Sequence, residues 1–121
     1  MKKVLIVDDS KVMRLMIRRT LRQAGFESLD VHEAENGVEG IAQFKEQAPQ
    51  VVLADWNMPE MGGLELLENL RGIEPNVVFG FITSEQSDEI RSTARQAGAR
   101  FLIPKPFTPD DFKVTLGTFL R

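Results

Sequence analysis

The chain has 121 residues and no cysteine, so it fits one domain with a buried core and contains neither disulfides nor thiolate metal sites. Its formal net charge of −3 argues against direct nucleic-acid binding, which normally uses a basic stripe. No run approaches the roughly 20 apolar residues of a membrane span, and the first run is too short for a signal peptide. We expect a single cytoplasmic domain over residues 1–121 without membrane contact.

Five short apolar runs alternate with stretches of helical periodicity. Several runs lack a polar alternation, as do strands that helices cover on both faces. The predicted strands are 3–7, 29–33, 51–54, 77–83 and 100–104. Strand–helix alternation predicts an α/β fold with a parallel sheet and helices on both of its faces.

The first helical stretches show their buried sides through apolar spacing. The first has a stripe that ends before Gly25, formed by Met13, Met16, Ile17, Leu21 and Ala24. In the second, Asn36 and Glu39 have the spacing of a capping box, and Val38, Ile41 and Ala42 are expected to face inward.

The other three helices are marked by both apolar spacing and end signals. Leucines at 64, 67 and 70 precede Gly72, and apolar residues at 90, 94 and 97 precede Gly98. In the last helix, Thr108 is the expected N-cap, Pro109 the first helical residue and Asp111 the capping partner.

Polar residues stand where four of the five predicted strands end. Asp8 and Asp9 follow the first strand, Asp55 follows the third, Thr83 ends the fourth, and Lys105 follows the fifth. Because ligands of open α/β sheets bind beyond the carboxyl ends of the strands, we expect these side chains to converge. Any one acid could instead cap a helix, as Asp9 or Ser10 could do, but the whole set predicts a site.

The predicted site has the chemistry of phosphoryl transfer. Crowded carboxylates repel one another unless a cation joins them, and hard oxygen ligands suit Mg²⁺, with Mn²⁺ as a substitute. A carboxylate beside a divalent cation can act as a nucleophile toward phosphorus. Lys105 would offset charge on the phosphoryl oxygens, and Thr83 could donate a hydrogen bond to one of them.

The segments VLIVDDS, AENG, VVLADWNMPEMGGLEL, FITSE and IPKPF resemble, in this order, the response-regulator receiver family. The resemblance covers essentially the whole chain and is strongest to the single-domain chemotaxis regulators. It implies a flavodoxin-like (βα)5 fold with strand order 2-1-3-4-5, an order that the spacing alone does not fix.

The resemblance also implies roles for individual residues. Asp55 matches the phosphoacceptor, Asp9 a direct Mg²⁺ ligand, Asp8 a ligand through water, and the backbone carbonyl of Asn57 a further ligand. Lys105 matches the lysine that contacts the phosphoryl group.

Two further sets of residues are implied by the same likeness. Thr83 matches the switch hydroxyl, and Asn57 and Glu85 match positions that tune dephosphorylation. The peptide bond between Lys105 and Pro106 is expected to be cis.

The implied partners are a sensor histidine kinase, which donates the phosphoryl group, and a downstream protein target. The target would meet the fourth helix, fifth strand and fifth helix, where Arg91, Leu102 and Phe107 are the candidate surface residues. The chain would be a monomer when unphosphorylated, and it would catalyse only its own phosphorylation and dephosphorylation.

Three residues depart from the family's pattern. Leu102 stands where an aromatic residue is common, so an aromatic side chain cannot reorient there with Thr83. Gly62 stands where an acid is common, which affects the start of the third helix. Pro104 lacks an N–H group and is tolerated only on an edge strand, in agreement with the implied strand order.

Three other functions deserve comparison with a phosphorylation switch. A phosphatase of the haloacid-dehalogenase type needs a D-x-D pattern after its first strand, whereas Asp8 and Asp9 are adjacent. A flavin protein needs a phosphate-binding loop there, and the two acids would repel a flavin phosphate. A constitutive docking module would keep the fold without the switch, and Leu102 is the residue that favours it.

Overall fold

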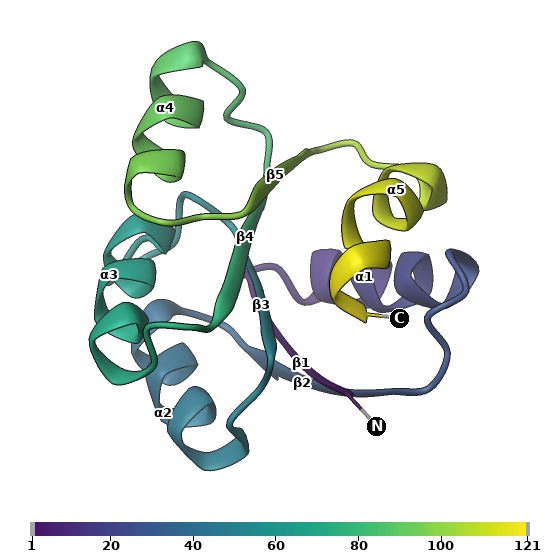
Figure 1. Cartoon of the computed structure of the whole chain (residues 1–121), viewed down its shortest axis with the longest axis horizontal. Coiled ribbons are helices and arrows are strands. Elements are labelled where there is room, and N and C mark those ends of the chain that lie inside the picture. Colours follow the sequence, from purple (N-terminus) through teal and green to yellow (C-terminus); the bar gives the residue numbers. More distant parts are fainter. Residues whose placement is uncertain (1, 121) are drawn as a thin grey trace.

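The computed structural model describes residues 2–120, in which five strands alternate with five helices (Figure 1). The strands are β1 (Lys2–Val7), β2 (Leu29–Ala34), β3 (Val51–Ala54), β4 (Val78–Thr83) and β5 (Phe101–Pro104). The helices are α1 (Lys11–Gln23), α2 (Gly37–Gln47), α3 (Gly63–Ile73), α4 (Asp88–Gln96) and α5 (Pro109–Leu120). The predicted strand positions are confirmed, with each boundary within one residue.

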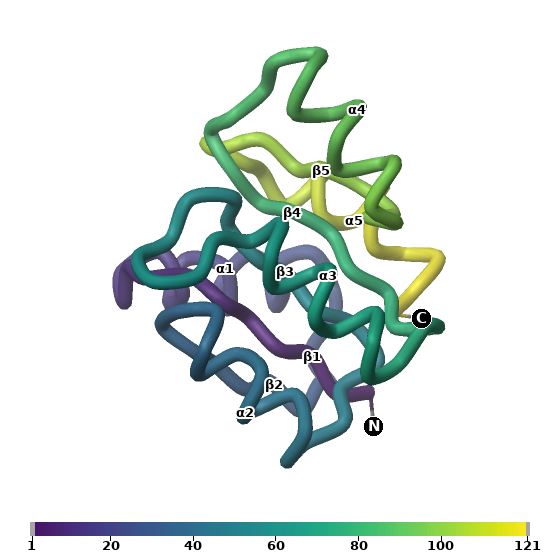
Figure 2. Tube along the Cα trace, turned by 90° about the vertical axis from the view of Figure 1, so that its left-hand side faces the viewer, coloured from purple at the N-terminus to yellow at the C-terminus, as the bar shows by residue number. Residues whose placement is uncertain are grey.

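All neighbouring strands pair in parallel, in the order β2-β1-β3-β4-β5. Helices α1 and α5 cover one face of the sheet, and α2, α3 and α4 cover the other (Figures 1 and 2). The predicted fold and strand order are therefore confirmed. Within residues 2–120, no helix is both long and apolar enough to cross a bilayer.

The two helical layers enclose two cores, one on each face of the sheet. Along β1, Val4 and Ile6 join the core under α1 and α5, whereas Leu5 and Val7 join the one under α2, α3 and α4. Successive side chains of a strand point to opposite faces, so a strand covered on both faces must be apolar throughout. This arrangement explains why the central strands show no polar alternation, whereas the edge strand β2 contains the half-buried residues Asp30, His32 and Glu33.

Three of the residues predicted to be buried are exposed. Met16 is 46% exposed, Val38 is 54% exposed, and Ala42 also faces solvent. In α2 the buried face consists of Gly37, Gly40 and Phe44, with Ile41 half-buried.

The glycines explain the error in α2. A Cβ atom at Gly40 would lie in van der Waals contact with the side chain of Val7, at 3.4 Å, so this glycine stands on the face of the helix that packs against the sheet. Assigning the inward face from apolar side chains alone overlooks such positions. In α1, Met16 lies beside Ile17 at the rim of the stripe, outside the face that Ile17 and Leu21 bury.

The helices begin and end where the residues at their predicted ends indicated, with one exception. Asn36 accepts a hydrogen bond from the Glu39 N–H, and Thr108 and Asp111 form a reciprocal capping box. Helix α3, however, continues through Gly72 to Ile73. Glycine there costs helix stability without ending the helix.

Helix α1 is joined to β2 through one carboxylate. Both Arg14 and Arg18 form ion pairs with Glu33, and Arg14 also donates to the backbone oxygen of Asp8 at 2.6 Å. Burial by itself raises the pKa of Glu33, but hydrogen bonds from the two guanidinium groups outweigh it and lower that pKa. These contacts hold α1 beside the loop that begins the candidate site.

Candidate functional site

Three carboxylates converge at the carboxyl edge of the sheet. Asp8 and Asp9 follow β1, Asp55 follows β3, and each contributes an oxygen that lies within 4.8 Å of the others. Asp8 is only 2% exposed, whereas Asp9 is open to solvent. The prediction that these three acids meet is confirmed.

Lys105 neutralises part of this negative charge. Its Nζ atom donates to Asp8 Oδ2 at 2.8 Å and to Asp55 Oδ2 at 3.2 Å. Burial alone lowers the pKa of Lys105, but the hydrogen bond to Asp8 and the charge of Asp55 outweigh it, so the pKa is raised. Lys105 precedes Pro106 through a cis peptide bond, as expected.

The backbone fixes the orientation of the carboxylates of Asp8 and Asp55. Asp55 Oδ1 accepts the N–H of Trp56 at 2.7 Å, which leaves Oδ2 to face Lys105. Asp8 Oδ1 similarly accepts the N–H of Ser10 at 2.9 Å. Each carboxylate therefore has one oxygen engaged by the backbone and the other turned to the ammonium group.

The start of α3 packs directly against the backbone of Asp55. A Cβ atom at Gly63 would lie 2.1 Å from the backbone oxygen of Asp55, closer than any real contact. Gly62, the N-cap, makes no side-chain capping bond, in keeping with the absence of an acid at that position. Glycine at 63 therefore sets how closely α3 approaches the end of β3.

Replacing Gly63 by alanine is expected to lower the free energy of unfolding by about 1–3 kcal/mol, because the new methyl group displaces the Asp55 backbone. Gly72→Ala in the same helix is the matched control: nothing lies within 4 Å of its Cβ position. It should stabilise the protein by about 0.5–1 kcal/mol. Urea denaturation of both variants measures this difference, and equal stabilities would contradict the close approach.

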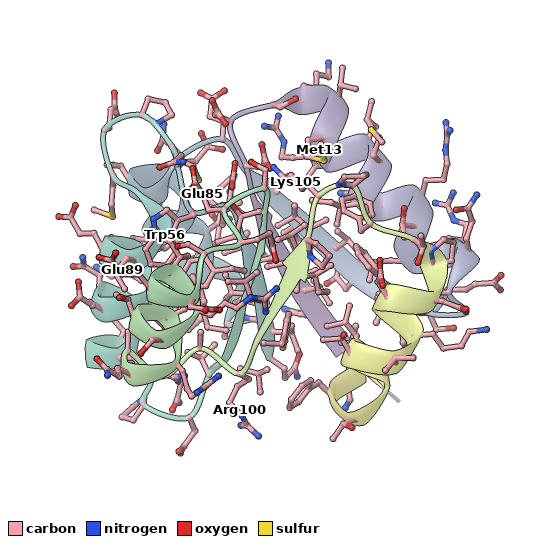
Figure 3. All side chains as sticks on the ribbon, turned by 90° about the horizontal axis from the view of Figure 1, so that it is seen from above. Met13, Trp56, Glu85, Glu89, Arg100 and Lys105 are labelled. Atoms are coloured by element: carbon pink, nitrogen blue, oxygen red, sulfur yellow. The ribbon has the colours of Figure 1, made fainter. Side chains whose placement is uncertain are left out.

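A hydroxyl and two polar side chains border the acids. Thr83 is 1% exposed, and its Oγ1 accepts the N–H of Glu85 at 3.2 Å. Asn57 donates from Nδ2 to Glu85 Oε1 at 3.0 Å, which places both residues at the open side of the site. Figure 3 shows Glu85 and Lys105 at the same end of the molecule.

The three residues expected to form an output surface are not all brought together. Arg91 is exposed on α4, and Leu102 and Arg91 line the same groove. Phe107 lies on the other side of the sheet, with its ring centre 4.9 Å from that of Phe112. Leu102 packs in the core under α2, α3 and α4, whereas Phe101 belongs to the opposite core, as strand alternation requires.

Sequence reasoning missed one residue beside the site, Gln86. Its Nε2 donates to the backbone oxygen of Thr83 at 2.7 Å, and its Oε1 accepts from Arg91 at 2.5 Å. The only signal in the sequence was a polar residue in the loop before α4. Such residues are common in loops for reasons unrelated to function.

The donor set fits a hard divalent cation. Carboxylate oxygens from Asp8, Asp9 and Asp55 are close enough to share one ion, and Mg²⁺ prefers a few carboxylates while it keeps several waters. The exposure of Asp9 leaves room for those waters. Lys105 offsets only part of the charge of the three acids, so a cation would be favoured there.

Comparisons with known proteins agree with this geometry. The family model for the response regulator receiver domain matches residues 4–116. The chain is 42% identical to the chemotaxis protein CheY1 of Helicobacter pylori, over 96% of this chain and 98% of that protein. It is 37% identical to the chemotaxis protein CheY of Thermotoga maritima, over 89% and 88% of the two chains.

Solved structures show the same similarity. The chemotaxis protein CheY4 of Vibrio cholerae superposes with a TM-score of 0.87 at 34% identity and covers 99% of both chains. A CheY-like receiver domain of Methanospirillum hungatei superposes with a TM-score of 0.88 at 30% identity, over 99% of this chain and 94% of that one. This family match favours the phosphorylation switch over the phosphatase and flavin-protein alternatives. The chain belongs to the response regulator receiver domain family, whose members are phosphorylation-activated switches of two-component signalling.

Proposed function

We propose that this chain receives a phosphoryl group on Asp55 from a sensor histidine kinase, and that phosphorylation changes its affinity for a downstream protein. The single observation that carries the proposal is the convergence of Asp8, Asp9 and Asp55 with Lys105 at one edge of the sheet. Asp55 Oδ1 is engaged by the Trp56 N–H, and Oδ2 faces Lys105. Oδ2 is therefore the oxygen that we assign as nucleophile.

The transfer is a displacement at phosphorus. Oδ2 of Asp55 forms a P–O bond while the P–N bond to the donor histidine breaks, and the imidazole leaves with the electron pair and takes up a proton. Lys105 is placed to offset negative charge on the phosphoryl oxygens. Hydrolysis returns Asp55 to its unphosphorylated form: water attacks phosphorus, the acyl P–O bond breaks, and inorganic phosphate leaves.

The proposed metal ligands are Asp8 through water, Asp9 and Asp55 directly, and the backbone carbonyl of Asn57. Mg²⁺ is the ion of choice and Mn²⁺ a substitute. When bound, the ion would neutralise the carboxylates and stabilise charge on the transferred group. The exposure of Asn57 and its hydrogen bond to Glu85 support a role for both in admitting the hydrolytic water.

The switch would act through Thr83. Its hydroxyl oxygen accepts the Glu85 N–H, and it stands on the strand next to the one that Asp55 follows. A phosphoryl group on Asp55 adds about −1.5 to −2 charges and strong acceptors. Turning the Thr83 hydroxyl toward them would release the Glu85 N–H and let the β4–α4 loop move.

Chemotaxis is the pathway that the relatives suggest, since several are named chemotaxis proteins. We infer a cytoplasmic protein that is monomeric before phosphorylation and meets its target through α4, β5 and α5. The exposure of Arg91 and the groove that it shares with Leu102 support this surface. Phe107 is half-buried against Phe112 on the other side of the sheet, which gives it a minor part at most.

Small phosphodonors test this function directly. Incubation with acetyl phosphate and Mg²⁺ should add one phosphoryl group to the intact protein, as measured by mass spectrometry. Trp56 should report the reaction through its emission, because its backbone contacts Asp55 and its ring centre lies 4.9 Å from that of Phe81. A protein that gains no mass and shows no emission change would contradict the proposal.

Measuring the affinity for a partner with and without beryllofluoride distinguishes a switch from a constitutive docking module. Beryllofluoride mimics the phosphoryl group on Asp55 without turnover. A switch binds its target with different affinity when loaded, whereas a constitutive module binds it equally well in both states.

A further inference from the structure

A guanidinium group holds the backbone that carries two of the three acids. Arg14 Nη1 donates to the backbone oxygen of Asp8 at 2.6 Å, and Arg14 Nε donates to Glu33 Oε1 at 2.7 Å. The side chain of Arg14 is only 13% exposed. Figure 3 shows Met13, the residue before it, at the same end of the molecule as Lys105. A largely buried arginine that is held at two points therefore borders the candidate metal site.

The sheet does not provide a partner for the backbone oxygen of Asp8. The N–H of Asp8 donates to the backbone oxygen of Ala34 at 3.1 Å, and the pairing of β1 with β2 and β3 ends at Val7. The oxygen of Asp8 thus lies just beyond the paired part of the strand. A buried backbone oxygen needs a donor, and here a side chain, that of Arg14, supplies it.

The same hydrogen bond orients Asp9. The oxygen of Asp8 and the N–H of Asp9 belong to one planar peptide group, so a bond that fixes this plane also fixes the point from which the Asp9 side chain starts. Within residues 2–120, the carboxylate of Asp9 forms neither a hydrogen bond nor an ion pair of its own. The backbone therefore directs Asp9 toward Asp8 and Asp55, with which it forms the cluster of acids.

The charge of Arg14 acts in the opposite direction from its hydrogen bond. A cation near the three acids opposes the binding of Mg²⁺ through electrostatic repulsion. Arg18, one turn further along α1, carries the same charge and pairs with the same carboxylate, Glu33. It donates to the backbone oxygen of Val31 and not to that of Asp8. The two arginines thus allow the effect of charge to be separated from the effect of position.

We propose that Arg14 is a positioning residue for the metal site: it holds the Asp8–Asp9 peptide group so that Asp9 is aimed at the ion. Glu33 in turn holds Arg14. This inference rests on the proposed function and adds a residue outside the acid cluster that sets the affinity for Mg²⁺. Groups that orient metal ligands typically change metal affinity by about 10–100-fold. Arg14 makes no contact with Asp55, so it should not act in phosphoryl transfer itself.

Arg14→Met removes both donors while it keeps the length of the side chain. Its affinity for Mg²⁺, measured by isothermal titration calorimetry, should fall by at least about tenfold. Arg18→Met is the matched control, because it removes the same charge and an ion pair with the same carboxylate without touching Asp8. It should bind Mg²⁺ within about twofold of wild type, since charge effects at this range are screened. Unchanged or higher affinity in Arg14→Met, or an equal loss in both variants, would overturn the proposal.

Arg14→Lys keeps the test decisive if Arg14→Met does not fold. The two acceptors of Arg14 are reached from different nitrogens, whereas lysine has a single nitrogen. The lysine variant should keep the ion pair with Glu33 and the fold, as checked by thermal unfolding. It should still bind Mg²⁺ at least about fivefold more weakly than wild type. Wild-type affinity in Arg14→Lys would show that any cation suffices at this position and would overturn the role of Arg14.

Phosphoryl uptake from acetyl phosphate distinguishes positioning of the metal ligand from general damage to the site. In Arg14→Met the Mg²⁺ concentration for half-maximal uptake should rise, while the rate at saturating Mg²⁺ stays within about twofold of wild type. A lower maximal rate with an unchanged Mg²⁺ dependence would contradict the inference. If the wild type binds Mg²⁺ and takes up phosphoryl groups while Arg14→Met has the same Mg²⁺ dependence, only the inference fails. If the wild type does neither, the proposed function fails and the role of Arg14 with it.

Discussion

Asp55→Asn is expected to abolish phosphoryl uptake from acetyl phosphate, by at least about a thousandfold, while the fold remains intact. Asparagine keeps an Oδ1 atom that can accept the Trp56 N–H, the bond that Asp55 makes at 2.7 Å. It replaces Oδ2, the oxygen 3.2 Å from Lys105, with an amide nitrogen that is a poor nucleophile and would face an ammonium group. The loss of phosphoryl uptake should therefore come from the missing nucleophile and not from a change in the fold.

Mass spectrometry of the intact protein measures the uptake, and thermal unfolding checks the fold. Glu35→Gln is the matched control, because it removes a carboxylate that directly follows β2 at the same edge but lies outside the cluster of three acids. The control should take up one phosphoryl group as the wild type does. Continued uptake by Asp55→Asn would place the phosphoryl group elsewhere and defeat the assignment.

Much of the fold could be predicted because both faces of the sheet are covered. A central strand then has to be apolar throughout, as in β3 (Val51–Ala54), and each helix has a single buried side, as in α5. The site could be predicted for a related reason. Parallel strands bring their carboxyl ends to one edge, so Asp8, Asp55 and Lys105 had to meet although they are far apart in sequence.

The errors arose where packing depends on the absence of a side chain or on a single contact. Glycines face the sheet in α2, so the exposure of Val38 could not be inferred from its apolar character. Phe107 could have faced solvent or the core, and only its contact with Phe112 decides this. The contacts of Gln86 with Thr83 and Arg91 could not be predicted, because they depend on the conformation of the loop before α4.

Removal of Mg²⁺ by a chelator is expected to slow phosphoryl uptake by about 10²–10³-fold, the loss typical when one stabiliser of transition-state charge is withdrawn. Asp8, Asp9 and Asp55 together with Lys105 leave the site with an excess of negative charge. An incoming phosphodonor brings further negative charge into the same place, and repulsion opposes its approach. Adding Mg²⁺ or Mn²⁺ back should restore the rate, whereas NaCl at equal ionic strength should not, because screening acts weakly on partly buried groups.

The Asp9→Asn variant tests whether Asp9 binds the metal ion or only adds negative charge to the site. The variant loses one ligand oxygen, so the Mg²⁺ concentration needed for half-maximal uptake should rise by about 10- to 100-fold. Without Mg²⁺ it should melt at a higher temperature than wild type, since Asp8 and Asp55 are relieved of a neighbouring charge. If instead the variant takes up phosphoryl groups at the wild-type Mg²⁺ concentration, Asp9 contributes charge to the site but does not bind the ion.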